Sequence, residues 1–364
     1  YGMSQGLPIF NAQRKERMKF PMAWGGNTDE SFEEWRSQAR TQVLETLLVK
    51  PPRTAFNARV IAREDRGTHE AQKILFSVSA DNEVPAYLLV PKGEGPFPAL
   101  ITLHDHGAHF SIGKEKVVRP FGVDDAVKID AETWVSKYYG GRYIGDHLAE
   151  QGYVVFSMDA LFWGERGRKE GEEYTAQQQL SANLLQLGMT WSGVITWDDI
   201  RSAEFVASLP EVDPSRIGAV GLSMGSHRTW MLSALSDRIA TGAAICWMGT
   251  SDVLTSPGNN QTTGQSAYSM LVPNLRNFLD YPDVASIAAP KPMLFYNGTK
   301  DGLFPVEGVE QAYAKMQGVW DSQGQGDRLE TKLWSVPHEF NAAMQDEAFA
   351  WLNAQLKPRG AESK

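Results

Sequence analysis

The stretch GLSMG at residues 221–225 decides the fold, because it joins a short apolar run to a helical pattern. The run Ile217–Val220 precedes it, and apolar side chains recur at helical spacing from Ser226 onward. A serine in a Gly-x-Ser-x-Gly turn between a strand and a helix has a strained backbone, and the flanking glycines leave room for neighbouring chain. The amides that begin the helix can stabilise an oxyanion, so this turn predicts Ser223 as a nucleophile.

Around this turn, near-continuous apolar runs alternate with helical patterns. The runs cover residues 99–103, 153–157, 217–220, 242–247 and 293–296. Strands that are buried on both faces and alternate with helices predict an α/β fold with a mostly parallel central sheet and helices on both faces. We expect helices at 145–151, 199–209, 226–236, 306–317 and 341–356.

The chain before residue 98 has a different texture. Residues 1–25 lack periodicity and predict an extended arm, and a helix is expected to begin after Asp29 and Ser31 and to end before Pro51. Short strand-like segments at 58–63, 73–78 and 85–90 predict an antiparallel meander. We therefore divide the chain into an arm and helix (1–55) packed on the core and a catalytic domain (56–364), with lid-forming insertions near 111–140 and 161–195.

A serine hydroxyl needs a base to take its proton. In the α/β-hydrolase fold, which this turn indicates, the order along the chain is serine, acid, histidine. His338 is the predicted base, because the other downstream histidine, His227, lies in the helix that follows the serine. Asp301, in the turn after the 293–296 strand, is the predicted acid, and Asp252 after the preceding strand is the alternative.

The segment His104-Asp105-His106-Gly107-Ala108-His109 follows the first buried strand of the parallel region. Its position predicts that the amide of His106 or a neighbour joins the amide of Met224 in an oxyanion hole. The histidine spacing also suggests a metallo-hydrolase, but Ala108 stands where that pattern has an aspartate, and the later ligands lack suitable neighbours. We therefore predict no metal, and assign these imidazoles to the structure of the loop.

Several motifs together resemble the dienelactone hydrolase and acetyl xylan esterase branch of the α/β-hydrolases, over about residues 84–356. They are VPAYLLVP (84–91), LHDHG (103–107), DALFWGERG (159–167), GLSMG (221–225) and the pair Asp301 and His338. The motifs look especially similar to those of bacterial esterase-like proteins found beside polysaccharide-uptake systems. The resemblance implies a serine carboxylesterase that acts on a carbohydrate or small-molecule ester without a cofactor. Dienelactone hydrolases use cysteine where this chain has Ser223, which argues against that lactone activity.

Three further residues are predicted to contact substrate. Trp163 and Trp247 lie near strand ends and could present aromatic faces to a sugar ring, and Arg228 could pair with a carboxylate. Two alternatives to an esterase stay open. The same residues would serve a serine peptidase or amidase, and a protein of this fold can also bind without catalysis.

The net charge of −9 and the pI near 5.4 argue against nucleic acid as a partner, since phosphate binding needs a basic surface. The longest apolar runs are too short to span a membrane, so no membrane association is expected. The first residues lack the apolar segment of a signal peptide, which predicts a cytoplasmic protein; the mature form of an exported protein is the alternative. A homo-oligomer is left open.

Overall fold

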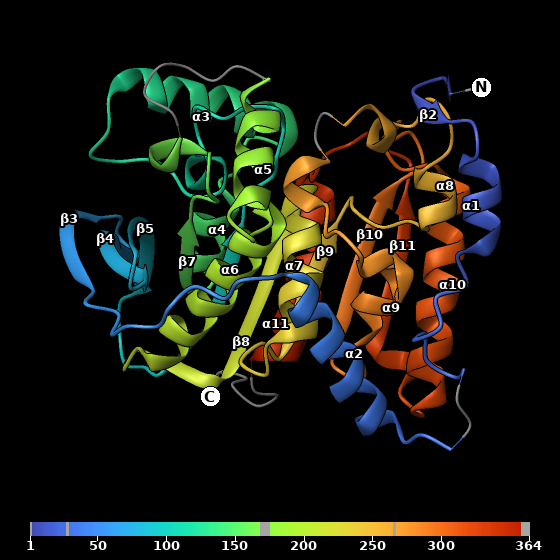
Figure 1. Cartoon of the computed structure of the whole chain (residues 1–364). Coiled ribbons are helices and arrows are strands. Elements are labelled where there is room, and N and C mark those ends of the chain that lie inside the picture. The colour runs from blue at the N-terminus through green and yellow to red at the C-terminus, as the bar shows by residue number, and fades with distance from the viewer. Residues whose placement is uncertain (1, 27–28, 168–174, 265–266, 358–364) are drawn as a thin grey trace.

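The computed structural model describes residues 2–26, 29–167, 175–264 and 267–357. A nine-stranded sheet runs through it in the order β11-β10-β9-β8-β6-β7-β5-β4-β3 (Figure 1). Every neighbouring pair from β11 to β7 is parallel, and β5, β4 and β3 continue the sheet in antiparallel fashion. The strands are β3 Arg59–Asp65, β4 His69–Ser79, β5 Asn82–Pro91, β6 Phe97–Leu103, β7 Val154–Met158, β8 Val212–Leu222, β9 Thr241–Ile245, β10 Met293–Gly298 and β11 Leu329–Trp334.

Helices cover both faces of this sheet, which confirms the predicted architecture (Figure 1). Side chains alternate across β6: Ala99 and Ile101 belong to the core under one helix, α6 (Trp191–Ser208). Leu100 belongs to the core on the other face, under α4 (Ile144–Glu150) and α11 (Ala342–Leu356). The helices are α1 Asn11–Arg17, α2 Phe32–Thr46, α3 Asp125–Tyr138, α4 Ile144–Glu150, α5 Ala176–Gln186, α6 Trp191–Ser208, α7 Met224–Leu235, α8 Ser251–Leu254, α9 Tyr281–Ser286, α10 Val306–Ser322 and α11 Ala342–Leu356.

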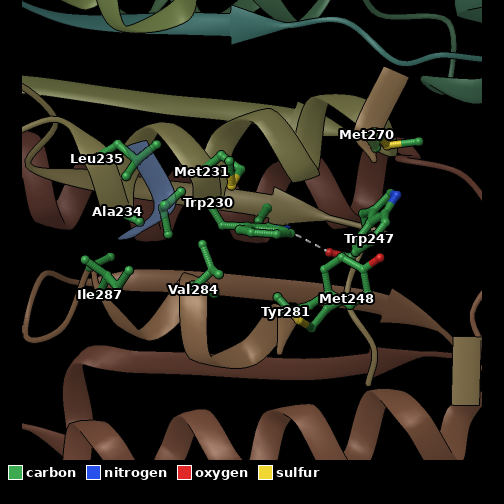
Figure 2. Packing of buried hydrophobic residues seen from close by; sticks show 14 of the residues in the cluster. Trp230, Met231, Ala234, Leu235, Trp247, Met248, Met270, Tyr281, Val284 and Ile287 are labelled. Carbon is green, nitrogen blue, oxygen red and sulfur yellow. Dashed lines mark hydrogen bonds between the residues drawn. The ribbon is translucent and has the colours of Figure 1, made fainter. Parts of the chain in front are cut away.

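Helix α7, which follows the GLSMG turn, is buried along its whole length. Figure 2 shows its apolar residues packed toward Val284 of α9 and Ile287 just after that helix. Trp230 donates a hydrogen bond to the carbonyl of Trp247 (3.2 Å). A helix enclosed in this way cannot shift without opening the core, so the turn at its beginning has a rigid base.

The N-terminal arm differs from the prediction. Residues 2–26 contain the strand pair β1 Met3–Ser4 and β2 Leu7–Pro8 and the helix α1, which buries no residue and therefore shows no apolar periodicity in the sequence. Polar contacts hold α1 to the segment after β9: Asn11 donates to the carbonyl of Thr255 (3.3 Å), and Lys15 pairs with Asp252 (3.1 Å).

Three long segments leave the carboxyl ends of the parallel strands. The first predicted insertion holds the turn η1 (Lys114–Lys116) and α3. The second predicted insertion holds η2 (Gly164–Arg166), α5 and the beginning of α6. Helix α6 starts at Trp191 rather than at the predicted residue 199. Residues 168–174 of this insertion lie outside the described part of the chain. The third, residues 246–280, was not predicted. No helix among the described residues has the length and apolar character needed to cross a bilayer.

Candidate active site

Ser223 lies between the end of β8 and the beginning of α7, in the strained conformation expected of it, with φ 60° and ψ −121°. Its amide donates to the carbonyl of Ile245 on β9 (2.7 Å), which holds the turn against the sheet. A Cβ atom on Gly225 would lie 2.0 Å from the carbonyl oxygen of Leu103, so only glycine fits there. The glycine pattern of 221–225 thus reflects the close approach of α7 to β6.

His338 and Asp301 come from neighbouring strand ends and meet beside the serine. His338 follows β11, and its Nε2 lies 2.8 Å from the hydroxyl oxygen of Ser223. Its Nδ1 lies 2.6 Å from Oδ2 of Asp301, which follows β10. The amide of Leu303 donates to the other Asp301 oxygen (2.9 Å), so the carboxylate is held on both sides. The three predicted side chains therefore form one hydrogen-bonded series.

The alternative acid lies elsewhere. Asp252 is in α8, its side chain is 73% exposed, and it pairs with Lys15 of α1. The carboxylate that reaches His338 is that of Asp301. Asp301 has a fully buried side chain, so its charge acts on the imidazole with little screening by water.

The loop after β6 supplies backbone amides near Ser223. His106 and Gly107 line the same cavity as Ser223, and Met224 is the first residue of α7. Among the described residues, no acceptor receives the N–H of Met224, His106 or Gly107. These amides are therefore free to donate to a ligand atom in the cavity.

The imidazoles of this loop hold its shape. His104 is buried, with Nδ1 against the carbonyl oxygen of Asp105 and Nε2 accepting from the amide of Ala160 (both 2.9 Å). His106 accepts from the amide of Ala108 and contacts the side chain of Gln177, also at 2.9 Å. Burial lowers the pKa of both histidines, that of His106 to about 4, so both are neutral at pH 7. Their ring nitrogens are thus engaged within the protein.

A cavity of about 220 Å³ lies over Ser223. Its walls come from the loop after β6, α3, the turn between β8 and α7, the third long segment and the loops after β10 and β11. The lining residues are Asp105, His106, Gly107, Ala108, Trp134, Tyr138, Leu222, Ser223, Trp247, Asn260, Gln261, Met270, Leu303, Phe304 and His338. Sequence reasoning missed the contributions of α3 and of Asn260, Gln261 and Met270. The i, i+4 spacing of Trp134 and Tyr138 on one helix was the available signal.

Of the three residues predicted to contact substrate, Trp247 lines the cavity and the other two do not. Trp163 is fully buried; it stacks on Trp191 and donates to the carbonyl of His106 (3.1 Å). Arg228 is 3% exposed and pairs with Asp199 of α6. Both predictions are therefore corrected: these side chains are directed into the protein because neighbouring elements offer partners for their polar groups.

Comparisons with known proteins identify a relative and several structural neighbours of this chain. YtaP of Bacillus subtilis (strain 168), whose name proposes a hydrolase, is 27% identical over 322 residues, which is 88% of this chain and 100% of YtaP. A Bacteroides fragilis protein whose name proposes an acetyl xylan esterase has a TM-score of 0.66 at 17% identity, over 88% of this chain and 80% of that one. A glucuronoyl esterase from Solibacter usitatus has a TM-score of 0.64 at 14% identity, over 92% and 96% of the two chains.

These structural neighbours fit the predicted resemblance to the acetyl xylan esterase branch. The sequence profile of the Abhydrolase family matches residues 12–323, which includes the GLSMG turn and Asp301. The chain therefore belongs to the Abhydrolase family and has the α/β-hydrolase fold.

Proposed function

We propose that this protein is a serine carboxylesterase in which Ser223 attacks the acyl carbon of an ester. The observation that carries the proposal is the hydrogen-bonded series from Ser223 through His338 to Asp301, with distances of 2.8 and 2.6 Å. His338 Nε2 takes the hydroxyl proton and passes it to the leaving alcohol, while Asp301 keeps Nδ1 protonated and stabilises the imidazolium. Water then attacks the acyl-enzyme by the same route in reverse, so only protein groups and water take part.

When Ser223 attacks, negative charge develops on the carbonyl oxygen of the ester, and hydrogen-bond donors already held in place stabilise it. We assign this role to the amides of Met224 and His106, with that of Gly107 as a third donor. Their support is the lack of an acceptor for these amides among the described residues, and the place of His106 and Gly107 in the cavity wall. A Cβ at Gly107 would lie 2.3 Å from the ring of Trp134, so this close backbone approach also requires glycine.

The substrate that fits best is an uncharged carbohydrate ester with a small acyl group, such as an acetylated sugar. Among the described residues, the lining of the cavity contains no lysine or arginine. Trp134 and Tyr138 add half-buried aromatic rings to the lining, and Asn260 and Gln261 add amide groups that can bond to sugar hydroxyls. The structural neighbours named as an acetyl xylan esterase and a glucuronoyl esterase both support a carbohydrate ester, and the first also supports a small acyl group.

The test uses the purified chain and Ser223→Ala with four substrates: p-nitrophenyl acetate, acetylated xylo-oligosaccharides, the methyl ester of glucuronic acid and an aminoacyl anilide. We expect hydrolysis of the two acetyl esters by the wild type and at least a roughly 10³-fold lower rate for Ser223→Ala. Equal rates for the two proteins would refute the nucleophile. Preference for the anilide would favour a peptidase, and preference for the methyl ester would overturn the assignment of the acyl group.

A further inference from the structure

We infer that Lys116, a buried lysine outside the cavity lining, is a positioning residue for the oxyanion hole. The inference rests on the proposed function, because it concerns how the amides of His106 and Gly107 come to face the cavity. Lys116 lies in η1, at the beginning of the first insertion, and is fully buried.

The ammonium group of Lys116 donates to two consecutive backbone carbonyls. Its Nζ lies 3.0 Å from the carbonyl oxygen of Asp105 and 3.0 Å from that of His106. It also lies 3.4 Å from Oδ2 of Asp105, so a nearby carboxylate balances its charge. An ammonium has three donor directions, and here all three are used by the loop after β6.

Because the peptide unit is planar, the direction of these two carbonyls fixes the direction of the N–H groups of His106 and Gly107. In a planar trans peptide, the C=O and the N–H of the same unit point in opposite directions. The carbonyls of Asp105 and His106 face Lys116, so the N–H groups of His106 and Gly107 point away from it. Both residues line the cavity over Ser223, and neither amide has an acceptor among the described residues.

Other donors also contact this loop, but they are uncharged. Among the described residues, Lys116 is the only cation bonded to these two carbonyls. Trp163 Nε1 donates to the His106 carbonyl (3.1 Å), and the hydroxyl of Tyr139 donates to Oδ1 of Asp105 (2.6 Å). A cation bonded to a carbonyl oxygen also polarises the peptide, which strengthens its N–H as a donor. Lys116 thus both orients and activates the amides without contacting substrate.

The variant Lys116→Met removes the ammonium and keeps most of the side-chain volume. With p-nitrophenyl acetate we expect kcat to fall roughly 10²-fold while KM changes by less than about 3-fold, because the lost interaction acts in the transition state. A trifluoromethyl ketone, which forms an oxyanion on attack by serine, should bind weaker by a similar factor.

Lys291→Met is the matched control. Lys291 also donates to two backbone carbonyls, those of Ser233 (2.7 Å) and Ser236 (2.8 Å), but at the opposite end of α7. We expect this variant to lose thermal stability and to keep the wild-type kcat. If Lys116→Met behaves in the same way, with lower stability and unchanged kcat, the inference is wrong although the esterase proposal stands.

Lys116→Gln provides a second route if Lys116→Met does not fold. Its side-chain amide can still donate a hydrogen bond but carries no positive charge. We expect a fall of roughly 3- to 10-fold in kcat with KM unchanged, and a wild-type kcat would overturn the inference. Absence of esterase activity in the wild type, or full activity in Ser223→Ala, would instead refute the underlying function.

Discussion

Arg228 and Asp199 form a bidentate ion pair in which Nε and Nη2 of the arginine donate to the two carboxylate oxygens at 2.9 and 2.7 Å. Both side chains are 2% exposed, and the pair ties α7 to α6. Arg228 is close to Ser223 in sequence, but the direction of its side chain along α7 takes it toward α6 and away from the cavity. Its role in this structure is to hold α7, the helix that begins directly after Ser223.

Arg228→Met should therefore destabilise the fold strongly. The change leaves the Asp199 carboxylate buried without its partner, and removal of one member of a buried pair costs about 3–5 kcal/mol. Lys15→Met is the control, because its partner Asp252 is 73% exposed and such pairs contribute less than about 1 kcal/mol. Urea unfolding followed by tryptophan fluorescence measures both, and equal losses would contradict the importance of burial.

Asp301→Asn should lower kcat far more than it lowers stability. An asparagine at this position can present its amide to His338 and favour the wrong tautomer, which in serine hydrolases of known mechanism reduces kcat about 10⁴-fold. Asp252→Asn should keep wild-type activity, since that side chain contacts α1. Kinetics on p-nitrophenyl acetate decide between them; a larger loss in Asp252→Asn would transfer the acid role.

Gly225→Ala should disrupt the junction between α7 and β6. The new methyl group would lie 2.0 Å from the Leu103 carbonyl oxygen, and the backbone on both sides belongs to packed elements. We expect a loss of more than about 3 kcal/mol or failure to fold. Gly318→Ala is the comparison: it lies within α10 with nothing within 4 Å of the added atom, so helix propensity predicts a gain of about 0.5–1 kcal/mol. Thermal denaturation of the two variants would show opposite shifts.

Stability should fall as the pH drops below about 6.5, in part because of His227. Burial lowers the pKa of His227 to about 3. Between about pH 6.5 and pH 3 this imidazole is therefore protonated in the unfolded chain but neutral in the folded chain. A shift of this size amounts to roughly 4 kcal/mol at pH 3. His227→Phe removes this proton uptake and should flatten the acid limb of a stability–pH curve.

Trp230→Phe is the control for that curve. It alters a buried ring of α7 that contacts His227 but removes no titratable group, so the acid limb should keep its wild-type slope. A wild-type acid limb in His227→Phe would assign the loss of stability to other groups, such as His106, whose pKa burial also lowers.

Much of the sheet could be predicted because its strands are buried on both faces and read as apolar runs. The predicted run 293–296 lies within β10, and the predicted helix at 226–236 agrees with α7 to within two residues. The GLSMG turn could be recognised because Gly221 and Gly225 stand where the structure leaves no room for a Cβ atom. Helix α1 escaped prediction because it buries none of its residues and leaves no periodic pattern.

The cavity walls were harder to predict, because they depend on how separate segments meet. Nothing local to Asn260 or Gln261 indicates that they approach Trp134, which lies more than a hundred positions earlier. The direction of Arg228 likewise depends on Asp199, a partner on another helix. Side-chain direction relative to a pocket is a tertiary property, and proximity to Ser223 in sequence was a poor guide to it.

The single cysteine of the chain, Cys246, lies at the end of β9, fully buried, and burial raises the pKa of its thiol well above the usual range. A thiol that stays protonated and enclosed does not react with maleimides in the native state. The native wild-type protein should therefore take up no thiol label, so that a label would attach only at an introduced cysteine. A cysteine introduced at the exposed Lys137 of α3 would carry one fluorophore beside the cavity wall, and its emission would report substrate entry in real time.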